Sequence, residues 1–261
     1  MTGIRPGTTS DFPLAEFDGD SPALIDPSEG VVITGDVPER VVVCFFRDVI
    51  DELCGEGRAD VVAETTWESG THHLYRLPVD GGHVGVFHPG VGAPLATGVL
   101  EVMIASGGRT FVACGGAGAV IPGLALGHVV VPDAAVRDEG TSYHYLPASR
   151  EVAADPAVTA VLAAVLAERD IPHVVGKTWT TDGIYRETQA KIAARRAEGC
   201  LTVEMETAAF FAVARHRSVT FGQYLYAGDD VSGSVWDHRR WQTSSARRDL
   251  FWLAVAAVLR L

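Results

Sequence analysis

Residues 83–118 read HVGVFHPGVGAPLATGVLEVMIASGGRTFVACGGAG, and this stretch contains the repeating unit that determines the fold. Two short apolar runs within it, residues 83–88 and 110–114, predict strands buried inside a sheet. Between them lies a predicted helix with a proline in its first turn. A glycine-rich loop follows each expected strand, at residues 89–94 and 115–118. A strand–loop–helix–strand unit of this kind is typical of a sheet covered by helices.

Apolar runs and helical patterns continue to alternate on both sides of this stretch. We therefore predict an α/β fold with three layers, α/β/α, around a central mixed sheet. Residues 1–30 are rich in Pro, Gly, Asp and Ser and predict an irregular N-terminal arm, whereas residues 31–261 predict a single domain. The other expected strands are residues 40–46, edge strands within 58–77, 127–132, 173–175 and 221–227, and the other expected helices are residues 48–53, 155–169, 187–198, 207–216 and 244–261.

The composition predicts a globular, acidic protein. Of the 261 residues, 47% are hydrophobic, which is enough for a sizeable core, and the formal net charge is -12. Such a charge disfavours nucleic acid and membranes as partners. No apolar run approaches the ~20 residues that span a bilayer, and the first ten residues carry no apolar segment typical of a secretory signal. The four cysteines form no C-x-x-C pair and predict reduced thiols, so we expect a cytoplasmic protein.

The two glycine-rich loops predict a ligand site. Ligands of open α/β sheets bind at the carboxyl ends of strands, and glycine lets a ligand approach the backbone there. Tight turns without a ligand are the alternative reading of either loop alone. Neither loop has the spacing of a Walker A or a G-x-G-x-x-G motif, so an NAD-dependent enzyme is disfavoured. The histidines have no spaced carboxylate partners, and we expect no metal site.

Two glutamates and a methionine, Glu204-Met205-Glu206, stand directly before the apolar run 208–214. In one interpretation these acids complement the positive end of the helix that follows. In the other, a carboxylate accepts hydrogen bonds from two neighbouring hydroxyls of a sugar, with the methionine packed on the sugar face.

This segment resembles the Glu-Met-Glu signature of the nucleoside phosphorylase family, which includes uridine phosphorylase, hexameric purine nucleoside phosphorylase and the methylthioadenosine nucleosidases. The resemblance extends from about residue 38 to residue 232. It implies a phosphorylase/hydrolase-like fold and an enzyme that acts on the N-glycosidic bond of a nucleoside. It also implies a homo-oligomer, from dimer to hexamer, with no cofactor and with phosphate as co-substrate. Four further stretches resemble family motifs in the same order: residues 90–94, 110–120, 136–142 and 181–185.

The resemblance assigns roles to individual residues. Glu206 would bind the ribose 2′- and 3′-hydroxyls, and Asp229 would protonate or hydrogen-bond N7 of a purine, with Asp230 as the alternative acid. A uracil base is not expected, because the family's Gln and Arg beyond Tyr185 are not in register here. The remaining expected substrate-binding residues are Glu204, Met205, Arg137, Ile184, Tyr185, Gly116, Gly92 and His88.

The phosphate site departs from the family pattern. An arginine position of the family is Ala113 here, a threonine is Gly116, and a subunit-bridging arginine is absent near Gly70. We expect Arg47, Arg40 and Gly90 to bind phosphate instead, and Gly35-Asp36 resembles the family's first phosphate motif. Phosphorolysis is the expected reaction. Hydrolysis by a nucleosidase, with Asp48 activating water, and a non-catalytic nucleoside-binding protein are the alternatives.

Overall fold

The computed structural model describes residues 12–19, 21–29, 37–240 and 245–261. Gly35 and Asp36 lie outside the described residues, so the phosphate motif expected there is not placed. Ten described strands form one mixed sheet. Their bounds are β1 Arg40–Cys44, β2 Asp60–Trp67, β3 Gly70–Val79, β4 Gly82–Phe87, β5 Thr110–Ala119, β6 Val129–Asp138, β7 Glu151–Ala153, β8 His173–Thr181, β9 Cys200–Glu204 and β10 Thr220–Asp230.

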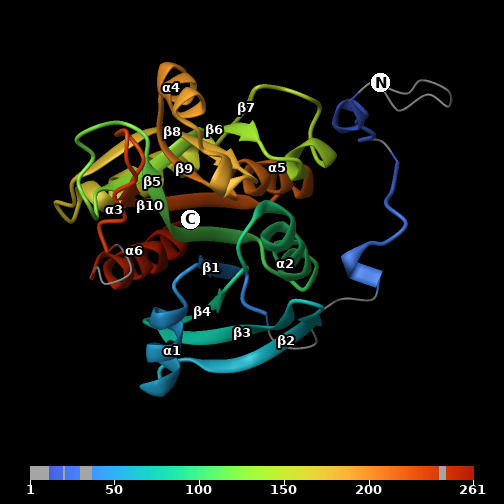
Figure 1. Cartoon of the computed structure of the whole chain (residues 1–261). Coiled ribbons are helices and arrows are strands. Elements are labelled where there is room, and N and C mark those ends of the chain that lie inside the picture. The colour runs from blue at the N-terminus through green and yellow to red at the C-terminus, as the bar shows by residue number, and fades with distance from the viewer. Residues whose placement is uncertain (1–11, 20, 30–36, 241–244) are drawn as a thin grey trace.

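Helices cover both faces of this sheet (Figure 1), as the α/β/α prediction requires. Alternate residues along a strand point to opposite faces. The helix bounds are α1 Arg47–Gly55, α2 Ala93–Ala105, α3 Pro156–Ala167, α4 Gln189–Ala197, α5 Thr207–Arg217 and α6 Ala246–Arg260. In β1, Val42 and Cys44 pack in the core under α1, α3 and α6, whereas Val41 and Val43 pack in the core under α2 and α5.

The sheet closes on itself at one side, which the sequence did not predict. β5 pairs with β9 on one edge and with β10 on the other, and β10, β6, β8 and β9 pair in turn. β1 also pairs with β5, and β4, β3 and β2 extend the sheet outward from it. β5 is therefore the junction of the fold, and the segment at its carboxyl end lies between several strand ends.

Most expected elements are present, with bounds within a few residues of those predicted, but the prediction for the second glycine-rich segment was wrong. The expected strand from Thr110 was predicted to end at Cys114, with a loop at residues 115–118. Instead β5 continues through these glycines to Ala119, because residues 115–117 pair with β10 and Gly118 pairs with β9. Two strands, β7 and β9, were not predicted. Both are short: β7 pairs with the strand before it, β6, whereas β9 pairs with β5, which is distant in the sequence.

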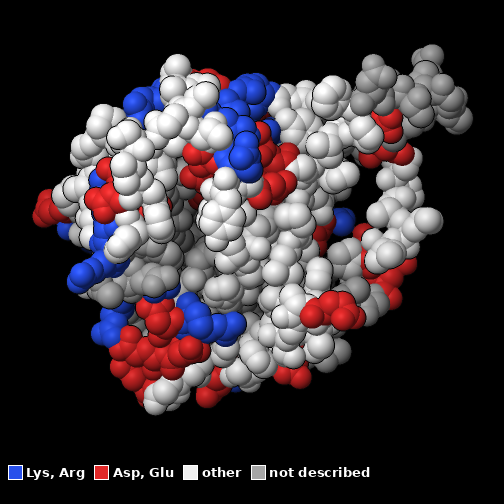
Figure 2. Space-filling view, in the orientation of Figure 1, with Lys and Arg blue, Asp and Glu red and all other residues white. Residues whose placement is uncertain are grey.

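The described part of the N-terminal segment carries two short 3-10 helices, η1 Pro13–Ala15 and η2 Pro27–Glu29, and lies along one side of the body (Figure 1). An ion pair of 3.5 Å joins Asp26 to Arg217 of α5. Within the described residues, no helix is long and apolar enough to cross a membrane. On the face seen in Figure 2, the described Lys and Arg side chains lie among Asp and Glu instead of forming one continuous basic surface. An anionic ligand therefore has to be held by local cationic residues.

Candidate active site

A cavity of about 270 Å³ lies where β1, β5, β9 and β10 end. β1 and β10 both run parallel to β5, so the carboxyl ends of the three strands meet at one edge of the sheet. Segments far apart in the sequence therefore contribute to one wall. The residues that line the cavity are Phe45, Phe46, Val91, Gly115, Gly116, Ala117, Gly118, Ile184, Glu187, Val203, Glu204, Met205, Glu206, Gln223, Leu225, Gly228, Asp229 and Arg247.

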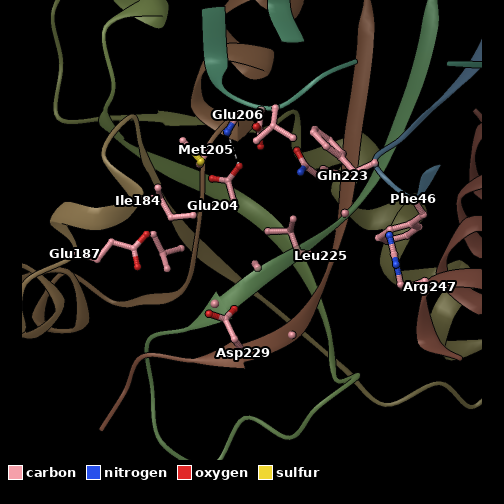
Figure 3. A pocket seen from close by; sticks show the side chains of 18 residues that line it. Phe46, Ile184, Glu187, Glu204, Met205, Glu206, Gln223, Leu225, Asp229 and Arg247 are labelled. Atoms are coloured by element: carbon pink, nitrogen blue, oxygen red, sulfur yellow. Dashed lines mark hydrogen bonds between the residues drawn. The ribbon is translucent and has the colours of Figure 1, made fainter. Parts of the chain in front are cut away.

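Ten of these side chains are labelled in Figure 3. Glu204, Met205 and Glu206 lie together at one end of the view, which we call the Glu206 end. Asp229 lies at the other end, which we call the Asp229 end, and Ile184 and Glu187 lie along one side between the two ends. Phe46 and Arg247 lie on the side opposite Ile184 and Glu187.

At the Glu206 end, Glu204 anchors the start of α5. Its Oε2 accepts hydrogen bonds from the backbone N–H groups of Glu206 (2.8 Å) and Thr207 (2.7 Å), and its Oε1 accepts one from Thr180 Oγ1 at 2.6 Å. Burial raises the pKa of the Glu204 carboxyl, and these donors oppose the rise. Glu204 is thus the helix N-terminal acid of the first interpretation, and it leaves the neighbouring carboxylate for another task.

Glu206 is 5% exposed, and its Oε1 accepts a hydrogen bond of 2.5 Å from the backbone N–H of Gly92. Burial, and next the charge of Glu204, raise the pKa of Glu206 to about 8. A carboxylate in this position gains from additional hydrogen-bond donors, because donors favour its ionised form. Paired hydroxyls of a ligand would supply them. Gly92 precedes α2 with a φ of 93°, a conformation that favours glycine.

Asp229 and Glu187 place two carboxyl groups at the Asp229 end. Asp229 Oδ2 accepts a hydrogen bond of 2.6 Å from Trp236 Nε1. Burial, and next the charge of Asp229, raise the pKa of Glu187 to about 7. Asp230, the alternative acid, does not line the cavity: its carboxylate pairs with Arg239 and accepts from the backbone N–H of Ser232.

The glycines of β5 keep the middle of the cavity open. A Cβ on Gly118 would lie 3.3 Å from Asp229 Oδ1 and 3.1 Å from Val203 Cγ1. A Cβ on Gly116 would lie 3.3 Å from the ring of Tyr226. The absence of side chains therefore lets a flat ligand lie against the β5 backbone, although these glycines lie in a strand and not in the predicted turn.

Arg247, at the start of α6, supplies a positive charge to the cavity wall. Its guanidinium stacks on Phe46, 4.9 Å from the ring centre, and forms an ion pair of 2.9 Å with Asp48. Arg47 lies outside the cavity lining but close enough to His88 for its charge to act on that ring. Burial, followed by Arg47, lowers the pKa of His88 to about 4. Cationic groups therefore gather beside this part of the cavity.

Several predicted residues lie beside the cavity lining or away from it. His88 Nδ1 accepts from the backbone N–H of Gly90 at 3.0 Å, so both belong to the loop next to the cavity. Tyr185 is 93% exposed and does not line the cavity. Arg40 begins β1, five residues before Phe45, and therefore lies about 16 Å away at the opposite end of the sheet.

Arg137, which was expected to bind substrate, also lies away from the cavity lining. It is buried, and its guanidinium donates to Ser142 Oγ, Ser149 Oγ and the carbonyl oxygens of Leu146 and Pro147. It thus secures the loop between β6 and β7.

Three polar lining residues, Glu187, Gln223 and Arg247, were missed by sequence reasoning. Glu187 lies just beyond the expected motif at residues 181–185, and only the path of that loop brings it back to Asp229. Gln223 is buried in β10, and its Oε1 accepts from Thr207 Oγ1 at 3.1 Å. Arg247 belongs to a helix near the end of the chain. None of the three stands in a local motif, so the sequence carried no signal for them.

Known proteins of similar sequence are phosphorylases. A guanosine phosphorylase of Halorubrum lacusprofundi is 28% identical over 197 residues, which cover 76% of this chain and 76% of that protein. A uridine phosphorylase of Thermococcus kodakarensis is 31% identical over 160 residues, which cover 61% of this chain and 53% of that protein. The second match thus spans about half the length of that relative.

Two solved structures share the fold. That of a uridine phosphorylase from Vibrio fischeri has a TM-score of 0.73 at 20% identity and covers 91% of this chain and 95% of that one. That of a purine nucleoside phosphorylase from Toxoplasma gondii has a TM-score of 0.74 at 19% identity, with coverages of 86% and 92%. The family model described as "Phosphorylase superfamily" matches residues 39–258. This match covers both ends of the cavity and most of the chain, and the chain therefore belongs to the phosphorylase superfamily.

Proposed function

We propose that this protein is a nucleoside phosphorylase that cleaves a purine nucleoside with phosphate, giving the free base and ribose 1-phosphate. The observation that carries the proposal is the pairing of Glu206 and Asp229 in one cavity whose middle is kept open by glycines. A buried carboxylate suits the two hydroxyls of a ribose, and a second carboxyl at the other end suits a base. Both curated relatives described above are named as phosphorylases of nucleosides, which supports the same reaction.

The reaction follows from these positions. Glu206 accepts hydrogen bonds from the ribose 2′- and 3′-hydroxyls, and Met205 packs against the sugar. As the C1′–N9 bond breaks, its electron pair leaves with the base, and Asp229 donates a proton to N7, which stabilises the leaving base. A phosphate oxygen forms the new bond to C1′. The proton lost by hydrogen phosphate restores the one given by Asp229 through solvent, so protons and charge balance.

The Asp229 end favours a purine, and among purines it favours guanine. The Glu187 carboxylate lines the cavity and accepts no hydrogen bond from the described residues. Guanine offers such an acceptor two adjacent donors, the N1–H and the 2-amino group, whereas adenine presents a lone pair at N1. The name of the Halorubrum lacusprofundi relative, guanosine phosphorylase, supports this assignment. Ile184 lies beside Glu187 and provides an apolar surface for the base.

Phosphate is favoured over water as the nucleophile. Arg247 lines the cavity and Arg47 stands near it, so positive charge is available for an anion. Asp48, which the nucleosidase alternative would use to activate water, is bound to Arg247, and its side chain is 55% exposed. Because the Asp48 carboxylate pairs with Arg247, it is poorly suited to activate a water molecule in the cavity.

The deciding experiment is base release from guanosine, inosine, adenosine and uridine, with and without inorganic phosphate, followed by chromatography. We expect purine release that requires phosphate and yields ribose 1-phosphate. Equal release without phosphate would instead identify a nucleosidase, and binding without release in either buffer would identify a nucleoside-binding protein.

A further inference from the structure

An exposed tryptophan in the segment that follows β10, Trp236, contacts the candidate acid Asp229. Trp236 is 61% exposed, so burial does not fix its position. Its indole Nε1–H nevertheless donates to Asp229 Oδ2 at 2.6 Å. The other oxygen, Asp229 Oδ1, is the one nearer to the β5 glycines, since a Cβ on Gly118 would lie 3.3 Å from Oδ1 and 3.7 Å from Oδ2. The two oxygens of Asp229 therefore have different surroundings.

The loop that carries Trp236 is held on several sides. Reciprocal backbone hydrogen bonds of 2.8 and 3.0 Å join Asp230 and Asp237 and close residues 231–236 into a loop. Arg196 and Gln189 of α4 donate to the carbonyl oxygens of Ser232 and Gly233. These contacts fix the backbone on both sides of Trp236. The indole thus reaches Asp229 from an anchored loop and not from a freely moving one.

A further anchor follows the tryptophan. Arg239 donates to the Leu124 carbonyl oxygen at 2.7 Å and forms an ion pair with Asp230. Asp230, the chain neighbour of Asp229, therefore holds the loop in place. Asp229 lines the cavity instead.

We propose that Trp236 is a positioning residue for Asp229: its indole N–H holds Oδ2, turns Oδ1 toward the base, and stabilises the carboxylate left after the proton has moved to N7. The proposal rests on the proposed function, because it assumes Asp229 as the proton donor. A hydrogen bond to an ionised carboxylate is stronger than one to a neutral carboxyl, so the indole favours the state reached after proton transfer. The effect is on the chemical step and not on substrate binding.

The test compares Trp236→Phe, which keeps an aromatic ring and removes the N–H, with Trp252→Phe, the same change in α6 beside Arg58. With guanosine and phosphate, we expect Trp236→Phe to lower kcat about 10-fold with little change in KM, and Trp252→Phe to leave both unchanged. Thermal melts of both variants establish that they are folded.

A second substrate separates positioning from a general structural effect. In N7-methylguanosine the base already carries a positive charge and accepts no proton at N7, so neither Trp236→Phe nor Asp229→Asn should slow its cleavage. The double variant should be no slower on guanosine than Asp229→Asn alone. Trp236→Phe with wild-type kcat, equal slowing on both substrates, or additive losses in the double variant would overturn the proposal while leaving the proposed function intact. A wild-type protein without phosphate-dependent cleavage would overturn both.

Discussion

At the Glu206 end of the cavity, both carboxyl groups are buried and accept hydrogen bonds from backbone N–H groups, whereas at the Asp229 end one carboxyl group is bound by a single exposed side chain and the other has no partner in the described chain. Glu204 binds the first N–H groups of α5, and Glu206 binds Gly92 N–H. At the other end Trp236 binds Asp229 and is itself largely exposed, and Glu187 has no hydrogen-bond partner in the described chain. Backbone donors are fixed by the fold. An exposed side chain such as Trp236 can instead be substituted without disturbing the core. The first end therefore suits the invariant part of a nucleoside, its sugar, and the second suits the variable part, its base.

Removing the acid of the Asp229 end should have the largest effect. We expect Asp229→Asn to lower kcat for guanosine about 10³-fold, because the base then leaves without a proton from a positioned acid. Steady-state assays with phosphate measure the change. Asp170→Asn, which alters a residue in the turn after α3 and outside the cavity lining, serves as the control. Turnover within 2-fold of wild type, a margin of about 0.4 kcal/mol in barrier height, would remove Asp229 from the mechanism.

The Glu206 end should respond next. Glu206→Gln keeps one acceptor oxygen but replaces the charged partner of the ribose hydroxyls, and we expect kcat/KM to fall about 10²-fold for every nucleoside tested. A 2′,3′-dideoxynucleoside lacks both hydroxyls and should be cleaved equally by variant and wild type. A fall in kcat/KM of the same size for that substrate would show that the carboxylate does not act through the diol.

The choice of base should depend on Glu187 and not on Glu206, which would separate the roles of the two ends of the cavity. In Glu187→Gln, the new amide NH₂ faces the 2-amino group of guanine, so guanosine should lose about 10-fold to 100-fold in kcat/KM relative to inosine. Adenosine should be unaffected. Competition assays with paired nucleosides measure these ratios directly. Glu168→Gln, which loses only an exposed ion pair with Arg260, is the matched control. An unchanged guanosine-to-inosine ratio would exclude Glu187 from base recognition.

The smallest effect concerns stability. The pKa of Glu206 is raised from 4.5 to about 8, so the folded protein holds this proton more tightly than the unfolded chain does. The resulting stabilisation is present below pH 4.5 and is lost as pH rises toward 8, and Glu187 adds in the same direction up to about pH 7. Denaturant melts between pH 5 and 8.5 should show a smaller loss for Glu206→Gln than for wild type. Parallel curves for the two proteins would contradict this.

Local patterns in the sequence were sufficient for most of the fold. The Asp155-Pro156 pair predicted the start of α3, where the Asp155 side chain accepts a hydrogen bond from Ala157 N–H. The alternation of apolar runs with helical patterns predicted the layered sheet. Patterns of this kind act within a few residues, where capping and periodicity decide the structure. For residues 115–118 the local pattern was misleading. Glycines there favour a turn, but pairing with β9 and β10 extends β5 through them.

The same division applies to the candidate site. The sequence by itself determined that a Glu-Met-Glu segment precedes a buried helix and that an aspartate lies near the end of the last strand, and these two features identified both ends of the cavity, although β10 extends to Asp230 and so includes Asp229. Only the tertiary structure decided which carboxylate caps α5, and that Arg40 and Arg137 lie away from the cavity while Glu187, Gln223 and Arg247 line it. The physical reason is that a side chain's partners depend on strand register and helix packing between distant segments. Those contacts form only when the whole sheet is assembled.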